Sequence, residues 1–279
     1  MQVLPPEVLA PYIKHYLFLE SIGDLYKTLR LFSDGNTGIV FLLEQVRLST
    51  NHRQHLPSSF LYGQISNFQD LTLTGQTSFI IIVFQPDGLY KLLGISAREL
   101  KEQIVSMQDV FGRPAKKLYD SLLHLKQLSK KVNALNTFFY ELAIQRRSPN
   151  HTLLSSVLQH IVYHKGLVTV EQLVQYSGYT ERHVERIFAE QIGMSPKKFG
   201  NIVQLHSFLK LLRHKTEETN LTTISHQSGY FDQSHLIRTF KKYTGITPSE
   251  YLNSTNKLAV NFMEFKAGLG QMSGLYNFT

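Results

Sequence analysis

An imperfect internal repeat in the C-terminal half restricts the fold more than any other feature of the sequence. The segment "SGYTERHVERIFAEQIGMSP" (177–196) is similar to "SGYFDQSHLIRTFKKYTGITP" (228–248). The Gly-Tyr pairs match at an offset of 51 residues and the later Gly and Pro at an offset of 52, so the second copy contains one inserted residue. Self-similarity of this kind indicates a repeated supersecondary unit.

Each copy has the pattern of two helices joined by a tight glycine turn. A short amphipathic stretch comes first, at 170–177 in one copy and 222–228 in the other, and a longer amphipathic run follows the turn. This helix-turn-helix order is one that proteins use to read DNA. Between the copies, residues 196–215 keep a helical period, which predicts a linking helix about 30 Å long. Because adjacent major-groove faces repeat at about 34 Å, one chain could place two reading helices on one side of a duplex.

The ends of these predicted helices carry legible capping signals. Ser or Thr at a cap position, Pro at the first helical position and Gly after the last turn are the typical residues. They are Thr169 with Gln172, Ser195 before Pro196, Thr247 before Pro248 with Glu250, and the terminal glycines Gly166, Gly193 and Gly245.

A helical projection separates an apolar face from a donor-rich face in both copies. The inner stripes are predicted to be Val184, Phe188 and Gln191 in the first copy and Leu236, Phe240 and Tyr243 in the second. The opposite faces carry arginines, which can grip guanine O6 and N7, and lysines at the rim suit phosphate contact. A solvated helix face is also charged, and it is the repetition at equivalent positions that favours DNA binding.

Residues 152–252 resemble the DNA-binding domain of the AraC/XylS family of bacterial transcription regulators. The segment "GYFDQSHLIRTFKKYTGITPSEY" (229–251) matches that family's signature in its Gly-aromatic turn, its helix start, its "R-x-F-K" centre and its "G-x-T-P" exit. The resemblance implies seven helices, two helix-turn-helix units and a linking helix. It also implies an N-terminal domain that senses a ligand or mediates dimerisation.

Carried over by position, the resemblance implies a set of DNA contacts. The base-facing residues are Arg182, His183, Glu185 and Arg186 in the first unit and Gln233, Ser234, His235 and Arg238 in the second, and the phosphate contacts are Lys197, Lys198, Lys241 and Lys242. Glu185 can accept a hydrogen bond from cytosine N4, but its charge repels phosphate. Asp232 is predicted to cap its helix rather than to contact a base. We expect the second unit to be the stronger reader.

The N-terminal half predicts an α+β domain that is β-rich, either cupin-like or a small sandwich, followed by helices. Strand patterns occupy 28–32, 37–43, 70–75 and 78–85, and a helical period runs over 114–147. The motif "PDGLYKLLG" (86–94) after a buried strand is similar to the N-terminal half of a subgroup of regulators with an uncharacterised, mostly β sensor. With "RRSPN" (146–150) as linker, the predicted domains are 1–147, 148–255 and a C-terminal tail, 256–279.

Composition excludes several classes of protein. Cysteine is absent, which removes disulfides, thiolate zinc sites and a cysteine nucleophile and fits a reducing, cytoplasmic setting. No signal-peptide pattern opens the chain, and its longest apolar run, "FIIIVF" (79–84), is too short to span a membrane. The net charge of +8 suits a polyanionic partner but is spread over both halves. The histidine pairs in "HRQH" (52–55) and "HIVYH" (160–164) lack the further ligands of a metal site, so we expect no metal and no cofactor.

These observations favour a sequence-specific transcription regulator controlled by a ligand or partner at its N-terminal domain. The predicted partners are double-stranded DNA, RNA polymerase, a small-molecule effector and a second copy of the chain. An architectural protein that bends DNA without a ligand is one alternative, and a regulator controlled by another protein is a second. An enzyme that borrows this reader is a third, but alkyl-transfer repair needs a cysteine and no nucleophile–base pair is identifiable, so we expect no enzymatic activity.

Overall fold

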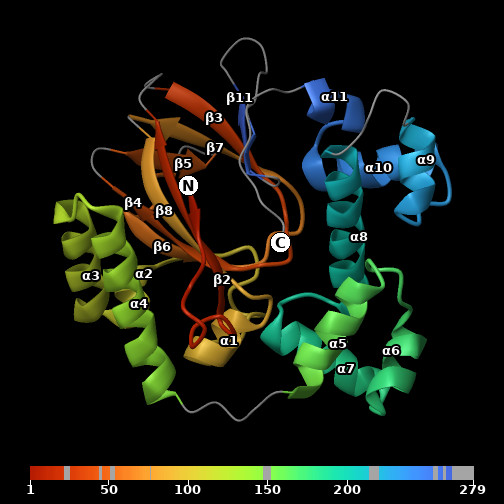
Figure 1. The fold of residues 1–279 in the computed structure, drawn as a ribbon, viewed down its shortest axis with the longest axis horizontal. Coiled ribbons are helices and arrows are strands. Elements are labelled where there is room, and N and C mark those ends of the chain that lie inside the picture. Colours follow the sequence, from red (N-terminus) through yellow and green to blue (C-terminus); the bar gives the residue numbers. More distant parts are fainter. Residues whose placement is uncertain are drawn as a thin grey trace.

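The computed structural model describes residues 1–21, 26–43, 46–50, 54–75, 77–146, 152–213, 220–253, 257–259 and 262–265. In the described residues, 1–146 form the N-terminal region, with four helices and most of two antiparallel sheets, and 152–253 form the C-terminal helical region (Figure 1). Two strands after residue 256 complete the second sheet. No helix in these described ranges is both long and apolar enough to cross a membrane.

The first sheet has six strands in the order β1-β2-β8-β4-β6-β9. Its strands are β1 (Gln2–Val3), β2 (Ile13–Ser21), β8 (Thr77–Phe84), β4 (Gly38–Leu42), β6 (Ser59–Tyr62) and β9 (Ile104–Ser106). Side chains alternate between its faces. Phe41 and Ile82 point to one face, under the helices, while Val40 and Phe79 point to the other, toward the second sheet. Both faces are therefore covered.

The second sheet has five strands in the order β10-β11-β3-β7-β5. Its strands are β10 (Lys257–Ala259), β11 (Phe262–Phe265), β3 (Tyr26–Leu31), β7 (Gln69–Thr74) and β5 (Arg47–Thr50). It faces the first sheet, so the N-terminal region is a β-sandwich with one open space between its sheets. The predicted strands at 28–32, 37–43, 70–75 and 78–85 are confirmed, and β2, β5, β6 and β9 were not anticipated.

Four helices complete the N-terminal region. They are α1 (Gly88–Leu93), α2 (Met107–Phe111), α3 (Arg113–His124) and α4 (Leu128–Gln145). The apolar stripe of α3, with Leu118 and Leu122, packs beneath the first sheet together with Phe139 of α4. Figure 1 shows α3 and α4 on this side of the sheet. The helical period predicted over 114–147 is confirmed as these two helices, and the stripe packs inside the molecule.

Seven helices follow in the described part of the C-terminal helical region, the number that the resemblance implies. They are α5 (Thr152–Tyr163), α6 (Val170–Ser177), α7 (Glu181–Gln191), α8 (Pro196–Arg213), α9 (Leu221–Gln227), α10 (Gln233–Thr244) and α11 (Pro248–Asn253). The predicted capping boxes at Thr169 and Thr247 both form. Gly166, Gly193 and Gly245 all have positive φ, as predicted for glycines that end helices.

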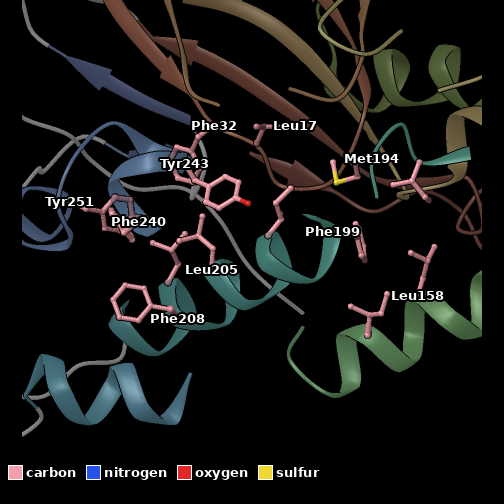
Figure 2. Close-up of a cluster of buried hydrophobic side chains, with 14 of the residues drawn as sticks. Leu17, Phe32, Leu158, Met194, Phe199, Leu205, Phe208, Phe240, Tyr243 and Tyr251 are labelled. Carbon is pink, nitrogen blue, oxygen red and sulfur yellow. The ribbon is translucent and has the colours of Figure 1, made fainter. Parts of the chain in front are cut away.

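The linking helix α8 is apolar around most of its circumference. Its buried residues are Pro196, Phe199, Gly200, Ile202, Gln204, Leu205, Phe208, Leu209 and Leu212. Its other positions are partly or fully accessible, and the exposed ones are Lys197, Lys210 and Arg213. One side meets α5 to α7 and another meets α9 to α11, as Figure 2 shows for Phe208 beside Phe240 of α10. Phe32 of the N-terminal region also reaches this helix, with its ring centroid 6.4 Å from that of His206.

The segment predicted as a tail after residue 255 contains two described strands. Strand β11 pairs with β3 in antiparallel register, with Phe262 opposite Leu31, and β10 continues the sheet beyond it. The first described residues of the predicted tail are therefore strands of the second sheet, which the sequence did not indicate. The chain returns from the C-terminal helical region to the sheet edge of the N-terminal region. The remaining residues of the predicted tail, 266–279, and the linker residues 147–150 lie outside the described residues.

Candidate DNA interface

Helix α7 is held at its start by a side-chain cap and along its length by an apolar stripe. The Thr180 hydroxyl accepts a hydrogen bond from the His183 amide at 3.3 Å. Val184, Phe188 and Gln191 are buried, which confirms the inner stripe predicted for the first unit. The outer face of the helix is turned away from the core by this packing.

Helix α10 of the second unit is fixed in the same way. The Asp232 carboxylate accepts a hydrogen bond from the His235 amide at 2.6 Å, so the prediction that Asp232 caps the helix is confirmed. Leu236, Phe240 and Tyr243 are buried, as predicted. The Phe240 ring meets Phe208 of α8 edge-on, with centroids 5.8 Å apart, so the reading helix is braced directly on the linking helix.

The predicted base-facing residues differ in how far they are exposed. Exposed side chains belong to Arg182, Arg186, Gln233, Ser234, His235 and Arg238, whereas His183 and Glu185 are half-buried. All four candidates of the second unit are thus open to solvent, compared with two of the first. The second unit therefore offers more side chains to a DNA partner than the first, and its role as the stronger reader stays a prediction.

Contacts within the first unit engage part of its outer face. The Tyr179 and His183 rings stack with centroids 4.5 Å apart. Arg186 lies 3.4 Å from the His183 ring nitrogen Nδ1 and 3.7 Å from a Glu190 carboxylate oxygen. Burial raises the pKa of Glu185, and the nearby charge of Glu181 raises it further. A base or phosphate would compete with these contacts for Arg186.

The predicted phosphate lysines are not equivalent. Lys197, Lys241 and Lys242 are exposed and Lys198 is half-buried, although Lys197, Lys198 and Lys242 all line a cleft of about 370 Å³ beside the loop at Ser66. Burial lowers the pKa of Lys198. Lys198 also lies near the charges of Lys101 and Glu102 of the N-terminal region, and its lower exposure leaves it less available to a DNA partner than the other three lysines.

An exposed aromatic residue in the second turn was missed by sequence reasoning. Phe231 is 85% exposed and directly precedes the Asp232 cap. It directly follows the Gly-Tyr pair that begins at Gly229. A large apolar residue is unusual in a polar turn, and this was the sequence signal that could have identified it. A ring here stands beside the start of α10, where a reading helix approaches DNA.

Hydrogen bonds join the N-terminal region to α7 of the first helix-turn-helix unit and to the neighbouring helix α5. The Ala97 amide donates to the Glu190 carbonyl at 2.7 Å, and the Tyr90 hydroxyl donates to the Glu190 carboxylate at 3.2 Å. Lys91 donates to the Ser155 hydroxyl at 2.9 Å. The end of α7 is therefore anchored to α1 and to the loop that follows it.

The loop after β3 contacts the linking helix itself. His206 of α8 lies with Nε2 3.2 Å from the Ser33 carbonyl, and burial lowers the pKa of this histidine, which favours a neutral ring that donates to the carbonyl. Gly35 lies against Phe199, since a methyl group added at Gly35 would fall 3.0 Å from the ring. Farther along, Arg30 reaches the Thr244 carbonyl at the end of α10, at 3.5 Å.

A cavity of about 720 Å³ lies between the two sheets of the N-terminal region. Its wall is largely apolar, and Asp34, from the loop that contacts the linking helix, forms part of it. A mostly apolar cavity of this size with a few polar groups is typical of small-molecule sites. The sequence did not predict it, because its lining comes from strands and loops far apart in the chain.

The described residues hold no cluster of three or more potential metal ligands. His160 and His164 do share a face of α5, with ring centroids 4.5 Å apart, but the His160 ring stacks on Tyr176. His52 of the other pair lies outside the described residues. The histidine pair on α5 is accounted for by ring packing.

Two family models match the chain. Residues 173–254 match a model described as a helix-turn-helix domain, and residues 1–106 match one described as a domain of unknown function. The first match takes in both capped reading helices and the linking helix between them. The chain carries an AraC-type helix-turn-helix domain. This AraC-type domain confirms the resemblance found in the sequence, and the relatives reported below are described as transcription regulators.

Characterised and uncharacterised regulators are among the relatives of this AraC-type chain. A protein of Haemophilus influenzae described as an uncharacterized HTH-type transcriptional regulator is 33% identical over 87 residues, 31% of this chain and 28% of that protein. The lactose operon transcription activator of Staphylococcus xylosus is 24% identical over 193 residues, 60% of this chain and 68% of that protein. Among solved structures, ToxT from Vibrio cholerae is 12% identical with a TM-score of 0.45, over 85% of this chain and 96% of ToxT. The chain thus matches less than a third of the length of the Haemophilus influenzae relative.

Proposed function

We propose that this chain is a sequence-specific transcription regulator whose DNA binding is controlled by a small molecule in the N-terminal cavity. The observation that carries the proposal is the pairing of two capped, exposed reading helices with one rigid linking helix. Helix α8 has 18 residues, which at 1.5 Å per residue corresponds to about 27 Å. A linking helix of this length supports a placement of the two units in neighbouring turns of a major groove, which repeat at about 34 Å.

The proposed DNA contacts follow the exposed faces of the two units. Arg182, Arg186 and Arg238 would read base edges, while Lys197, Lys241 and Lys242 would hold phosphates. Phosphate contacts would supply much of the affinity, and the arginines would supply the preference among sequences. Because Lys198 is half-buried against the N-terminal region, it is a weaker candidate than its neighbour.

Ligand control would pass through the loop between β3 and β4. Asp34 lines the cavity, while its neighbours Ser33 and Gly35 touch His206 and Phe199 of the linking helix. A ligand that binds one arrangement of this loop more tightly than another shifts the population of reader arrangements accordingly. The cavity favours this mechanism over a ligand-independent architectural protein, which would need no such space.

The test of the proposed function is a selection of genomic fragments on the purified chain at physiological salt. We expect a few fragments to be enriched and to share two short half-sites about one helical turn apart. Arg238→Ala should cost roughly 1–3 kcal/mol in affinity and relax the preference at one base position. Arg113→Ala, an exposed arginine on α3, is the matched control and should leave selection unchanged.

Two results would count against the proposal. Uniform retention of fragments would favour an architectural binder, and an equal loss on all sequences in Arg238→Ala would make this residue a phosphate contact. The resemblance also implies contacts with RNA polymerase and with a second copy of the chain, and a cytoplasmic location. These three, like the boundaries of the sensor and reader domains, stay predictions.

A further inference from the structure

The cavity between the sheets has a charge pattern opposite to that of the whole chain. The chain contains 29 Lys and Arg against 21 Asp and Glu, yet none of the described residues that line the cavity is lysine or arginine. Four of these lining residues are carboxylates: Asp34, Asp70, Glu102 and Asp109. A molecule in the cavity therefore meets negative charge from several sides.

Two of the four carboxylates are offset by nearby cations. Both oxygens of Asp70 accept from Arg30, at 2.6 and 2.7 Å. Glu102 lies near Lys198, a lysine whose pKa is lowered by burial, and the attraction between the two charges offsets part of that effect. The negative electrostatic potential that each of these two carboxylates produces in the cavity is therefore reduced.

The other two carboxylates keep their charge available. Asp34 accepts hydrogen bonds from the Asn36 amide at 3.0 Å and from its Nδ2 at 2.9 Å, both neutral donors. Within the described ranges no residue forms an ion pair with Asp34 or Asp109. Asp109 is exposed on α2 at the rim, whereas Asp34 is half-buried.

The wall between these charges is apolar and rich in aromatic rings. Phe60, Tyr62, Phe68 and Phe79 all line the cavity, but the Arg30 guanidinium already lies 4.2 Å from the centre of the Phe68 ring, which leaves the other three rings to face a ligand cation. Ring faces carry negative electrostatic potential, and aromatic rings near carboxylates are a common means of holding ammonium groups. The buried Thr50 hydroxyl, which also lines the cavity, has no hydrogen-bond partner and can serve a polar group of the ligand.

We propose that this cavity binds an apolar molecule that carries an amine or quaternary ammonium group, and that it rejects a carboxylate of the same size and shape. The inference rests on the proposed function, because it names the chemical class of the effector. The apolar body occupies the space between the sheets, and the cationic group lies on the side of Asp34. An anion at the same place loses this attraction and meets repulsion instead.

The experiment uses three probes with the same ring system and different charge. They are 1-naphthylmethylamine, 1-naphthalenemethanol and 1-naphthylacetate, each titrated into the full chain by calorimetry, a readout that does not depend on tryptophan, which the chain lacks. We expect the amine to bind about tenfold or more tighter than the acetate, with the alcohol between them. Raising the salt concentration should narrow the gap between amine and acetate.

Variants assign the preference to the cavity. Asp34→Asn and, separately, Asp109→Asn should each weaken amine binding several-fold and leave the alcohol unchanged. Asp34→Asn also alters a loop with local hydrogen bonds, so Asp109→Asn on the exposed side of α2 is the variant that leaves folding unaffected. Asp120→Asn, an exposed acid on α3 away from the cavity, is the matched control and should change none of the three affinities.

The outcomes separate this inference from the proposed function. Acetate binding as tight as amine binding, no binding of any probe, or full amine affinity in both variants would each overturn the charge preference. Fragment selection on DNA is measured independently of the probes. Selection without an amine preference leaves the regulator and removes this inference, whereas amine preference without selection leaves the cavity chemistry and removes the regulator.

Discussion

Replacement of Gly35 by alanine should weaken the contact between the N-terminal region and the linking helix. Gly35 has φ of +78°, and an added methyl group would lie 3.0 Å from Cε2 and 3.4 Å from Cδ2 of Phe199. The left-handed backbone costs an alanine about 1–2 kcal/mol whether or not the helix is in contact. The extra methyl in a packed contact typically costs about 1–3 kcal/mol, and this cost arises only while Phe199 lies against it. The docking equilibrium should therefore shift by about 5- to 150-fold toward separation.

Hydrogen exchange at Ala97 measures this separation at a distant point of the same interface. The Ala97 amide donates to the Glu190 carbonyl at 2.7 Å, so it is protected only while the two regions are in contact. We expect its exchange to accelerate about 5- to 150-fold in Gly35→Ala. Gly112→Ala is the matched control, since Gly112 also has positive φ but an added methyl would meet nothing within 4 Å.

Either of two results would refute this reasoning. Unchanged exchange at Ala97 in Gly35→Ala would mean that the loop contact does not contribute to docking. Equal acceleration in Gly35→Ala and Gly112→Ala would mean that backbone strain alone, and not the contact with Phe199, is responsible.

Two further predictions concern the stability of the fold. Asp232→Ala removes the cap of α10 and should lower the free energy of unfolding, measured by urea titration, by about 0.5–2 kcal/mol. Asp232→Asn can still cap the helix and should retain most of the stability. Equal losses in the two variants would contradict the capping role. Burial lowers the pKa of His15 to about 4, so between pH 6.5 and 4 the unfolded chain binds a proton that the folded chain does not. The free energy of unfolding should fall as the pH decreases through this window, by at most about 1.4 kcal/mol per pH unit from this group, and His15→Gln should flatten the slope; an unchanged slope would assign the effect to other groups.

The C-terminal helical region was largely predictable because its determinants are local. The caps at Thr169, Asp232 and Thr247 involve partners three residues away, and the buried stripes of α7 and α10 follow the helical period. A repeated local pattern also revealed that two such units exist. Information of this kind is contained in a short window of sequence, which is why the resemblance to AraC-type domains was recognisable there.

The N-terminal sheets were only partly predictable, since both faces of the first sheet are covered. In β2, Tyr16 and Phe18 face the helices while Leu17 and Leu19 face the other sheet, so the strand lacks the alternation of apolar and polar residues that marks a half-exposed strand. The strand β11 was missed for a different reason. Its pairing partner β3 lies more than 200 residues earlier, and no local signal reports such a pairing.

The sequence was sufficient to predict the candidate DNA interface, but it was not sufficient to predict the cavity. The sequence by itself determined the two reading helices, their caps, their buried faces and the residues on their outer faces, because hydrogen bonds and periodicity within a helix link residues three or four apart. Only the tertiary structure decided that Asp34 and Asp109 line one apolar space, that Lys198 lies beside the loop at Ser66, and that the loop at Gly35 touches the linking helix. Those contacts join residues tens to hundreds of positions apart, and they exist only once the sheets have closed on each other and the linking helix has packed against them.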